Sequence, residues 1–293
     1  MKKIALIGNG YWGSKIRKYV GEYFELKYVA NSKFDKTVIW KDDSVCGVII
    51  ATPIETHYDI AKEALIYGKH VLVEKPFTLK EKEAVHLKEI AKNNNVNVGV
   101  EYTQTFSKSI NKMTSSIHEI GKMEFIEMST KHLGRFMNHD VFWLLASHHL
   151  SILDMIVPID KIRVIRVDCV NNRDICTTGT LNLYNCSVNK NVGKIDVSLN
   201  YPAKDMHINI YGSIGTIKWN PDKIPTLEIT TYNKTYMDLP EKLVLSKKQF
   251  KYDERDNLLY SMKYFNDLMD GKAESNIDTA IKITRILEQC QQY

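Results

Sequence analysis

Three glycines near the start of the chain have the spacing of a dinucleotide-binding turn. The segment Gly8-Asn-Gly-Tyr-Trp-Gly13 follows the apolar run Ile4–Ile7 and precedes an expected helix. In such a turn the first glycine permits a sharp bend, the second lets the backbone approach a pyrophosphate, and the third lets helix and strand pack closely. The helix then offers N–H groups and the positive end of its dipole to the phosphates. The expected cofactor contacts here are Gly8, Asn9, Gly10, Tyr11, Trp12 and Gly13.

Polar side chains follow three further apolar runs, at positions where strands are expected to end. They are Thr52-Pro53 and His57 after residues 46–51, Glu74-Lys75-Pro76 after residues 70–73, and Glu101-Tyr102-Thr103-Gln104 after residues 96–100. Ligands of open α/β sheets bind at the carboxyl ends of parallel strands, so catalytic and binding groups are expected at these positions.

The elements that must position these groups alternate between strand and helix through the first third of the chain. Strands are predicted at residues 4–7, 26–30, 46–51, 70–73 and 96–100, and helices at residues 12–23, 56–67 and 80–93. This βαβ rhythm is typical of a parallel, doubly wound sheet, as in a Rossmann domain.

Beyond residue 100 the pattern changes. Helices are predicted at residues 109–119, 141–156, 257–269 and 278–289, and strands at residues 123–130, 161–170, 179–183, 194–199 and 206–211. The alternating or β-branched character of these strands favours an antiparallel sheet. A chain of 293 residues also exceeds one comfortable core. We therefore expect an α/β protein with a dinucleotide-binding domain at residues 1–120 and a second, α+β domain at residues 121–293.

Composition excludes several other classes of function. The formal net charge is +5, but the lysines are spread over many segments, which does not support nucleic-acid binding. The five cysteines are scattered without a C-x-x-C pair, so neither disulfides nor a metal site is predicted. No apolar run approaches the roughly 18 residues of a membrane span, and the first strand leaves no room for a signal peptide. A cytoplasmic protein without a membrane partner is expected.

Taken in order, the motifs resemble those of a known family. Besides the glycine turn, Ala51-Thr52-Pro53 with His57, and Glu74-Lys75-Pro76, the resemblance rests on Trp143–Asp154, Gly212-Ser-Ile-Gly215-Thr-Ile, and Arg255-Asp-Asn257 with Asp278 and Ala280. Over nearly its whole length the chain is similar to the glucose-fructose oxidoreductase / inositol 2-dehydrogenase / MocA (Gfo/Idh/MocA) family of NAD(P)-dependent oxidoreductases. The resemblance implies a second domain with an open, mostly antiparallel sheet, and homodimers or homotetramers formed through that sheet.

The resemblance also implies two catalytic residues, Lys75 and His148. A desolvated Lys75 ammonium beside the reacting hydroxyl and the nicotinamide would orient that hydroxyl and stabilise developing alkoxide charge. His148, in the segment Trp143-Leu-Leu-Ala-Ser-His-His, matches the family histidine, and its imidazole would accept or donate the substrate proton. The alternatives are a surface lysine after a strand and a partly buried helix histidine with a backbone partner.

One departure from the family pattern lies next to this histidine. The family aspartate four residues before it is replaced by Leu144, and the aspartate after it is replaced by His149. Leucine can neither support an imidazole nor bind a polar substrate. Because adjacent helix residues point about 100° apart, His149 is not expected to join the same site.

Further contacts are assigned from the same resemblance. Arg135 follows His132-Leu-Gly134 and would pair with a phosphate or carboxylate, the alternative being a solvated loop arginine. The expected substrate contacts are Lys75, Tyr102, Thr103, Phe106, Arg135 and His148, and the remaining cofactor contacts are Asn31, Ser32, Lys33, Thr52, Pro53, His57, Glu74 and Lys75.

The choice between NAD and NADP depends on the end of the second strand. An acidic residue about twenty positions beyond the glycines usually binds the adenosine ribose and selects NAD. Here the sequence is Asn31-Ser32-Lys33, without a carboxylate until Asp35. The absent acid removes repulsion of a 2′-phosphate, which Ser32 and Lys33 can bind, so NADP is favoured, although Asn31 can also serve a ribose hydroxyl.

Three hypotheses about function follow. The leading one is an oxidoreductase that moves a hydride between a nicotinamide cofactor and a secondary alcohol or ketone of a sugar, nucleotide-linked or phosphorylated. The second is a cofactor-binding protein with little or no catalysis, motivated by Leu144. The third is a reductase of a non-sugar substrate within the same fold, because fold alone does not determine function.

Overall fold

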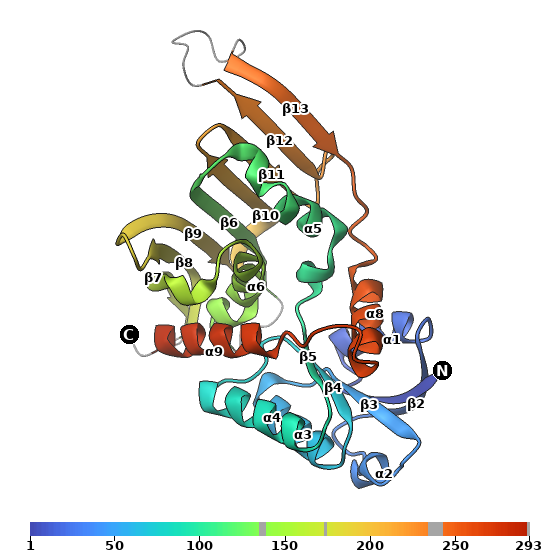
Figure 1. The fold of residues 1–293 in the computed structure, drawn as a ribbon. Coiled ribbons are helices and arrows are strands. Elements are labelled where there is room, and N and C mark those ends of the chain that lie inside the picture. Colours follow the sequence, from blue (N-terminus) through green and yellow to red (C-terminus); the bar gives the residue numbers. More distant parts are fainter. Residues whose placement is uncertain (135–138, 173–174, 234–242, 292–293) are drawn as a thin grey trace. The chain divides into compact units, whose positions relative to one another are not determined.

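The computed structural model describes residues 1–134, 139–172, 175–233 and 243–291. The chain folds into two compact units. The first unit contains residues 1–106 and 255–293, and the second contains residues 107–254. Figure 1 shows the elements of both units.

The first unit is built on a five-stranded parallel sheet (Figure 1). Its strands are β1 (Lys2–Ile7), β2 (Phe24–Ala30), β3 (Val45–Ile50), β4 (His70–Glu74) and β5 (Val98–Glu101), in the spatial order β2-β1-β3-β4-β5. β3 and β4 consist mostly of buried aliphatic residues, as expected for parallel strands covered on both faces. All five carboxyl ends lie along one edge of the sheet, where the site is expected.

The helices of the first unit come from both ends of its sequence. They are α1 (Tyr11–Val20), α2 (Thr37–Trp40), α3 (His57–Ile66), α4 (Glu81–Asn93), α8 (Asn257–Met269) and α9 (Ile277–Gln291). The apolar stripe of α8, with Met262 and Phe265 fully buried, joins Ile16 of α1 and Leu6 of β1 in one hydrophobic cluster. The C-terminal segment therefore completes the core of the N-terminal sheet.

Two strand glycines make room for α8. A Cβ on Gly47 of β3 would come within 2.9 Å of Met269, and one on Gly99 of β5 would come within 3.0 Å of Leu268 and Tyr264. These contacts are tighter than side chains normally make, so a side chain at either position would force the side chains of α8 to shift.

Residues 255–293 are thus placed differently from the expected division at residue 120. The sequence identified helices at residues 257–269 and 278–289, and the structure has α8 and α9 there. An amphipathic pattern shows that a helix buries one face, but it does not show which sheet covers that face. The partner of α8 is the parallel sheet of the first unit.

The second unit contains an eight-stranded sheet in the order β13-β12-β11-β10-β6-β9-β8-β7. Its strands are β6 (Met123–Leu133), β7 (Ile162–Asn172), β8 (Ile175–Asn185), β9 (Lys190–Ser198), β10 (Asn200–Gly212), β11 (Gly215–Trp219), β12 (Leu227–Tyr232) and β13 (Val244–Phe250). The pairs are antiparallel except for β6 with β9. The fold class is confirmed: a parallel doubly wound sheet followed by a mostly antiparallel one.

Helices of the second unit cover one face of this sheet. α5 (Lys108–Ser115) begins at Ser107, whose hydroxyl accepts hydrogen bonds from the N–H groups of Ser109 and Ile110. A π-helical turn, Phe142–Ala146, leads into α6 (Ser147–Ile156). The Phe142 ring packs over Gly179 of β8, where a Cβ would come within 2.5 Å of it.

The strands β12 and β13 lie beyond the last strand that the sequence pattern predicted. β13 reads Val-Leu-Ser-Lys-Lys-Gln-Phe and is mostly exposed, so it lacks the alternation that marks a half-buried strand. Within the described residues, no helix is long and apolar enough to span a membrane.

Candidate active site

The glycine turn is closely packed at its first and third glycines and open at its second. Gly8 has φ +103°, and a Cβ there would lie 2.2 Å from the Ala51 carbonyl oxygen. A Cβ on Gly13 would lie 1.9 Å from the Gly8 carbonyl oxygen, so only glycine lets α1 start this close to β1. At Gly10, by contrast, a Cβ would meet no protein atom within 4 Å. The space over Gly10, at the N-terminus of α1, is therefore open to a ligand.

Two aromatic side chains lie in the same turn. Tyr11 and Trp12 are 44% and 37% exposed, and their rings stack edge to face with centroids 5.5 Å apart. The Lys15 ammonium lies 4.3 Å from the Tyr11 ring centroid and 4.6 Å from that of Trp12. This cation–π arrangement holds a positive charge in the first turns of α1.

The segment after β2 is exposed and internally braced. Asn31, Ser32 and Lys33 are all exposed. The side-chain oxygen of Asn31 accepts a hydrogen bond from the Lys33 N–H at 2.9 Å. The side-chain oxygen of Asn31 is therefore engaged within the turn. The side chains of Ser32 and Lys33 are exposed to solvent.

His57 ties together the segments that follow β3 and β4. It is buried, with Nδ1 3.0 Å from the Pro76 carbonyl oxygen and Nε2 2.8 Å from the Thr52 carbonyl oxygen. Burial lowers the pKa of His57, which favours the neutral ring. Both ring nitrogens face backbone carbonyl oxygens, and because a neutral ring carries one N–H, His57 donates to one of the two, Thr52 or Pro76.

Thr52 is braced by a second bond, which fixes the turn after β3. The Thr56 hydroxyl donates to the Pro53 carbonyl oxygen and lies 2.8 Å from the Thr52 hydroxyl. Pro53 is exposed on this turn.

Lys75 lies at the carboxyl end of β4, beside a buried carboxylate. Glu74 is 6% exposed, and its Oε2 accepts a hydrogen bond from the Lys75 N–H at 3.2 Å. Burial raises the pKa of Glu74, and burial lowers the pKa of Lys75 while the Glu74 charge opposes that lowering. Burial disfavours the charged form of Lys75, and the neighbouring carboxylate favours it. A lysine in such surroundings is typical of functional sites.

Sequence reasoning assigned no role to Glu101, at the end of the neighbouring strand. Glu101 is fully buried and pairs in register with Glu74. The Ser261 hydroxyl of α8 donates a hydrogen bond to its Oε2. The signal in the sequence was that two strand ends each carry a glutamate, and the carboxyl ends of neighbouring parallel strands lie side by side.

The three substrate contacts that were expected after β5, Tyr102, Thr103 and Phe106, lie in different surroundings. Tyr102 is buried at 1% exposure, and Thr103 is half-buried next to the Glu101 carboxyl group. The Phe106 ring packs against Tyr264 of α8 with centroids 4.8 Å apart. All three are thus in contact with the protein interior of the first unit.

In the second unit, His148 lies on the partly exposed face of its helix. Within the run Val141–Leu150, Leu144 and His148 are the two residues that are not buried. They therefore share a face, as the four-residue spacing predicted. His149 is fully buried, and its Nε2 lies 2.8 Å from the Thr130 hydroxyl of β6. Burial lowers the pKa of His149 to about 3, so His149 is a neutral core residue.

An ion pair anchors the start of the segment that carries His148. The Asp140 carboxylate accepts a hydrogen bond from the Phe142 N–H at 2.9 Å. Arg166 of β7 donates to the same carboxylate at 2.6 Å and to Asp168 at 2.5 Å. A π-helical turn in this place is a frequent accompaniment of functional sites. Arg135 lies outside the described residues.

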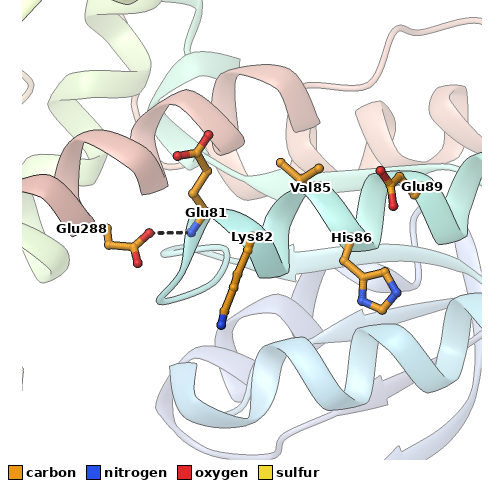
Figure 2. Close-up of a pocket in the computed structure, with 6 residues that line it drawn as sticks. All are labelled: Glu81, Lys82, Val85, His86, Glu89 and Glu288. Atoms are coloured by element: carbon orange, nitrogen blue, oxygen red, sulfur yellow. Dashed lines mark hydrogen bonds between the residues drawn. The ribbon is translucent and has the colours of Figure 1, made fainter.

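A surface depression of about 440 Å³ occurs elsewhere in the first unit. Figure 2 shows its lining residues, Glu81, Lys82, Val85, His86 and Glu89 of α4 and Glu288 of α9, with the Glu81 N–H donating to Glu288. None of these is an expected site residue. The strand ends and the glycine turn therefore remain the candidate site.

Comparisons with known proteins agree with this geometry. Residues 18–102 match the family model GFO_IDH_MocA, described as an oxidoreductase family with an NAD-binding Rossmann fold. The scyllo-inositol 2-dehydrogenase (NADP(+)) IolU of Bacillus subtilis is 30% identical over 108 residues, which cover 37% of this chain and 33% of that protein.

Two solved structures share the fold over nearly the whole chain. GenD2 from gentamicin A biosynthesis, in complex with NAD, has a TM-score of 0.83 at 17% identity, covering 99% of this chain and 93% of its own. Levoglucosan dehydrogenase, in complex with NADH, has a TM-score of 0.79 at 15% identity, covering 99% and 97%. The segments aligned with curated relatives, by contrast, span a third of those proteins or less.

Proposed function

Because residues 18–102 of this chain match the GFO_IDH_MocA family model, we propose that the protein is an NAD(P)-dependent dehydrogenase or reductase of sugars. The proposal depends on what lies at the carboxyl ends of the strands in the parallel sheet of the first unit. The space over Gly10 is open after β1, and Lys75 lies next to the Glu74 carboxylate at the end of β4. When bound, the nicotinamide supplies the two-electron chemistry by accepting or giving a hydride.

Lys75 acts on the substrate oxygen in this proposal. Its ammonium donates a hydrogen bond to the hydroxyl or carbonyl of the reacting carbon and stabilises the negative charge that develops there. Glu74 keeps that ammonium charged despite its burial, because the nearby carboxylate favours the protonated amine.

His148 is proposed as the proton-exchanging group. Its partial exposure on α6 and the anchored start of its helix support this role. A neutral imidazole accepts the substrate hydroxyl proton during oxidation, and an imidazolium returns one during ketone reduction.

The proposed substrate is a sugar or polyol with a secondary alcohol, nucleotide-linked or phosphorylated. The names of the relatives, scyllo-inositol 2-dehydrogenase and levoglucosan dehydrogenase, support a sugar or polyol. The nucleotide or phosphate group is proposed from the sequence alone, where Arg135 would pair with it. NADP is the proposed cofactor, since the exposed Ser32 and Lys33 can bind a 2′-phosphate and Asn31 stands where a carboxylate would select NAD.

One experiment tests the central assignment. Purified protein is titrated with NADPH and NADH by fluorescence, and turnover is measured with a panel of sugars and sugar nucleotides. The Lys75→Met variant is expected to lose turnover by about 100-fold or more while its cofactor dissociation constants stay within about threefold of wild type. Lys80→Met, an exposed lysine in the same unit, is the matched control.

The outcome that removes the mechanism is retained turnover in Lys75→Met.

Leu144 beside His148 favours a second candidate, a cofactor-binding protein without catalysis. Tight NADPH binding with no turnover on the whole panel, in wild type as in the variant, would support that second candidate instead.

A further inference from the structure

Glu74 and Glu101 form a buried pair of carboxyl groups on neighbouring strands. They occupy paired positions of β4 and β5, and side chains at paired positions of a parallel sheet lie on the same face. Their exposed fractions are 6% and 0%. Two carboxyl groups buried side by side cannot both be ionised without a large cost in free energy, because their charges repel each other and water does not solvate them.

In each of the two carboxyl groups, one oxygen accepts a hydrogen bond and the other has no partner in the part of the chain that the structure describes. Oε2 of Glu74 accepts from the Lys75 N–H, and Oε2 of Glu101 accepts from the Ser261 hydroxyl. Oε1 of Glu74 and Oε1 of Glu101 are both buried and have no partner among the described residues. A buried oxygen without a donor is costly, but a single proton held between two such oxygens satisfies both.

We propose that Glu101 is a positioning residue whose carboxyl group keeps its proton and donates it to Glu74, so that the pair carries one negative charge, on the carboxylate next to Lys75. This role of Glu101 rests on the proposed catalytic function of Lys75. The proton is shared within the pair, and no bond to substrate or cofactor changes.

The groups around Glu101 agree with a protonated acid. Burial, and then the charge of Glu74, raise the pKa of Glu101 well above its usual range, and the polar side chain of Thr103 opposes this. From α8, Tyr264 also faces this region, and burial raises its pKa to about 12, so that it stays neutral. Lys75 supplies the positive charge that acts on Glu74.

The consequence concerns the charge of Lys75. A donor at position 101 stabilises the ionised form of Glu74, and ionised Glu74 holds the pKa of Lys75 up. Without such a donor, burial drives Glu74 to the neutral acid, and Lys75 loses the charge that keeps it protonated.

The test measures the pKa of the Lys75 amine directly. Intact protein is acylated with a trace amine reagent across a range of pH, and the labelled fraction of the Lys75 peptide is quantified by mass spectrometry. Glu101→Gln, which still donates a hydrogen bond, is expected to leave the pKa of Lys75 unchanged. Glu101→Met, of similar size but without a donor, and Glu74→Gln are both expected to lower it by about one pH unit or more.

Two results would overturn the proposal. A fall in the pKa of Lys75 in Glu101→Gln as large as that in Glu74→Gln would mean that Glu101 is ionised. An unchanged pKa in a folded Glu101→Met would mean that its proton does not matter to Glu74. If Glu101→Met fails to fold, the decision comes from Glu101→Gln and from the infrared band of a protonated carboxyl group, expected in wild type and absent in Glu101→Gln.

This readout does not depend on turnover. If Lys75→Met retains activity, the catalytic role of Lys75 fails, but the labelling experiment still reports whether Glu101 and Glu74 share a proton. If the pKa of Lys75 ignores Glu101 while Lys75→Met is inactive, only the positioning role fails.

Discussion

The glycines of the first turn meet different physical demands, although they share one motif. Gly13 is required by the fold, since its Cβ position lies 1.9 Å from the Gly8 carbonyl oxygen. Gly10 has φ −81° and ψ −158°, which any residue can adopt, and its Cβ position is empty. The protein itself therefore does not require glycine at position 10, whereas a ligand bound over the turn would.

Gly10→Val and Gly13→Ala should therefore separate binding from folding. Gly10→Val is expected to weaken NADPH binding by about tenfold or more while lowering the free energy of unfolding by no more than about 1 kcal/mol. Gly13→Ala should lower the free energy of unfolding by about 1–3 kcal/mol. Fluorescence titration and urea denaturation check the pair, and equal NADPH affinity in Gly10→Val and wild type would contradict the site.

His149 predicts an acid-labile second unit. Its pKa is lowered to about 3 in the folded state by burial, against about 6.5 when unfolded. The unfolded chain therefore binds the extra proton first, so stability is complete above pH 6.5 and declines as pH falls from there toward 3. At about pH 5 the loss amounts to about 2 kcal/mol.

Replacing this histidine should remove that dependence. His149→Gln, which can still bond to Thr130, is expected to flatten the fall in the free energy of unfolding between about pH 7 and 5. His118→Gln, at an exposed histidine of the same unit, is the control and should keep the wild-type slope. Urea denaturation at each pH measures both, and parallel slopes for His149→Gln and wild type would refute the assignment.

At the level of elements, β5 is the edge strand of the parallel sheet, and a side chain from the C-terminal segment covers its edge. The Asn276 amide accepts from the Val100 N–H and donates to the Val100 carbonyl, both at 2.8 Å. The Ser275 hydroxyl donates to the Val98 carbonyl. A short segment thus takes the place of a sixth strand and protects the edge from pairing with other chains.

Removing the Asn276 amide should expose that edge. Asn276→Leu leaves a donor and an acceptor of Val100 unpaired and is expected to lower the free energy of unfolding by about 1–3 kcal/mol, with faster amide exchange at Val100. Asn93→Ala, at an exposed asparagine of α4, should change stability by less than about 0.5 kcal/mol. Protection of Val100 equal to wild type would show that the edge is held by other contacts.

The element pattern was largely predictable, and the reasons differ by element. β1, β3, β4 and β5 contain short apolar runs between turn residues, and the glycine turn identifies where α1 begins. β13 was missed because Ser246, Lys247, Lys248 and Gln249 interrupt any apolar alternation. Glu101 and Ser261 are 160 residues apart, and no local pattern predicts a contact over such a separation.

At the scale of the whole molecule, the first unit depends on residues far from it in sequence. Leu258, Met262, Phe265 and Leu268 of α8 are all buried in its core. Burying each is worth about 1.5–3 kcal/mol, so the four together approach the roughly 5–15 kcal/mol by which a domain is stable.

Truncation after Glu254 should accordingly unfold the first unit and spare the second. Fluorine-labelled tryptophan distinguishes them, because Trp12 and Trp40 lie in the first unit and Trp143 and Trp219 in the second. The ¹⁹F resonances of Trp12 and Trp40 are expected to collapse toward the free amino acid while the other two stay dispersed. Four dispersed resonances in the truncated protein would show that α8 is dispensable.

The return of the chain to its starting sheet has a consequence during synthesis on the ribosome. Translation delivers β1 first, yet the helix that closes its sheet emerges more than 250 residues later. Residues 107–254 are continuous in sequence, so the second unit can fold during synthesis before the first unit is complete. The sheet that is synthesised first is therefore completed last, and the strand that leads into the glycine turn gains its full core only after α8 has left the exit tunnel.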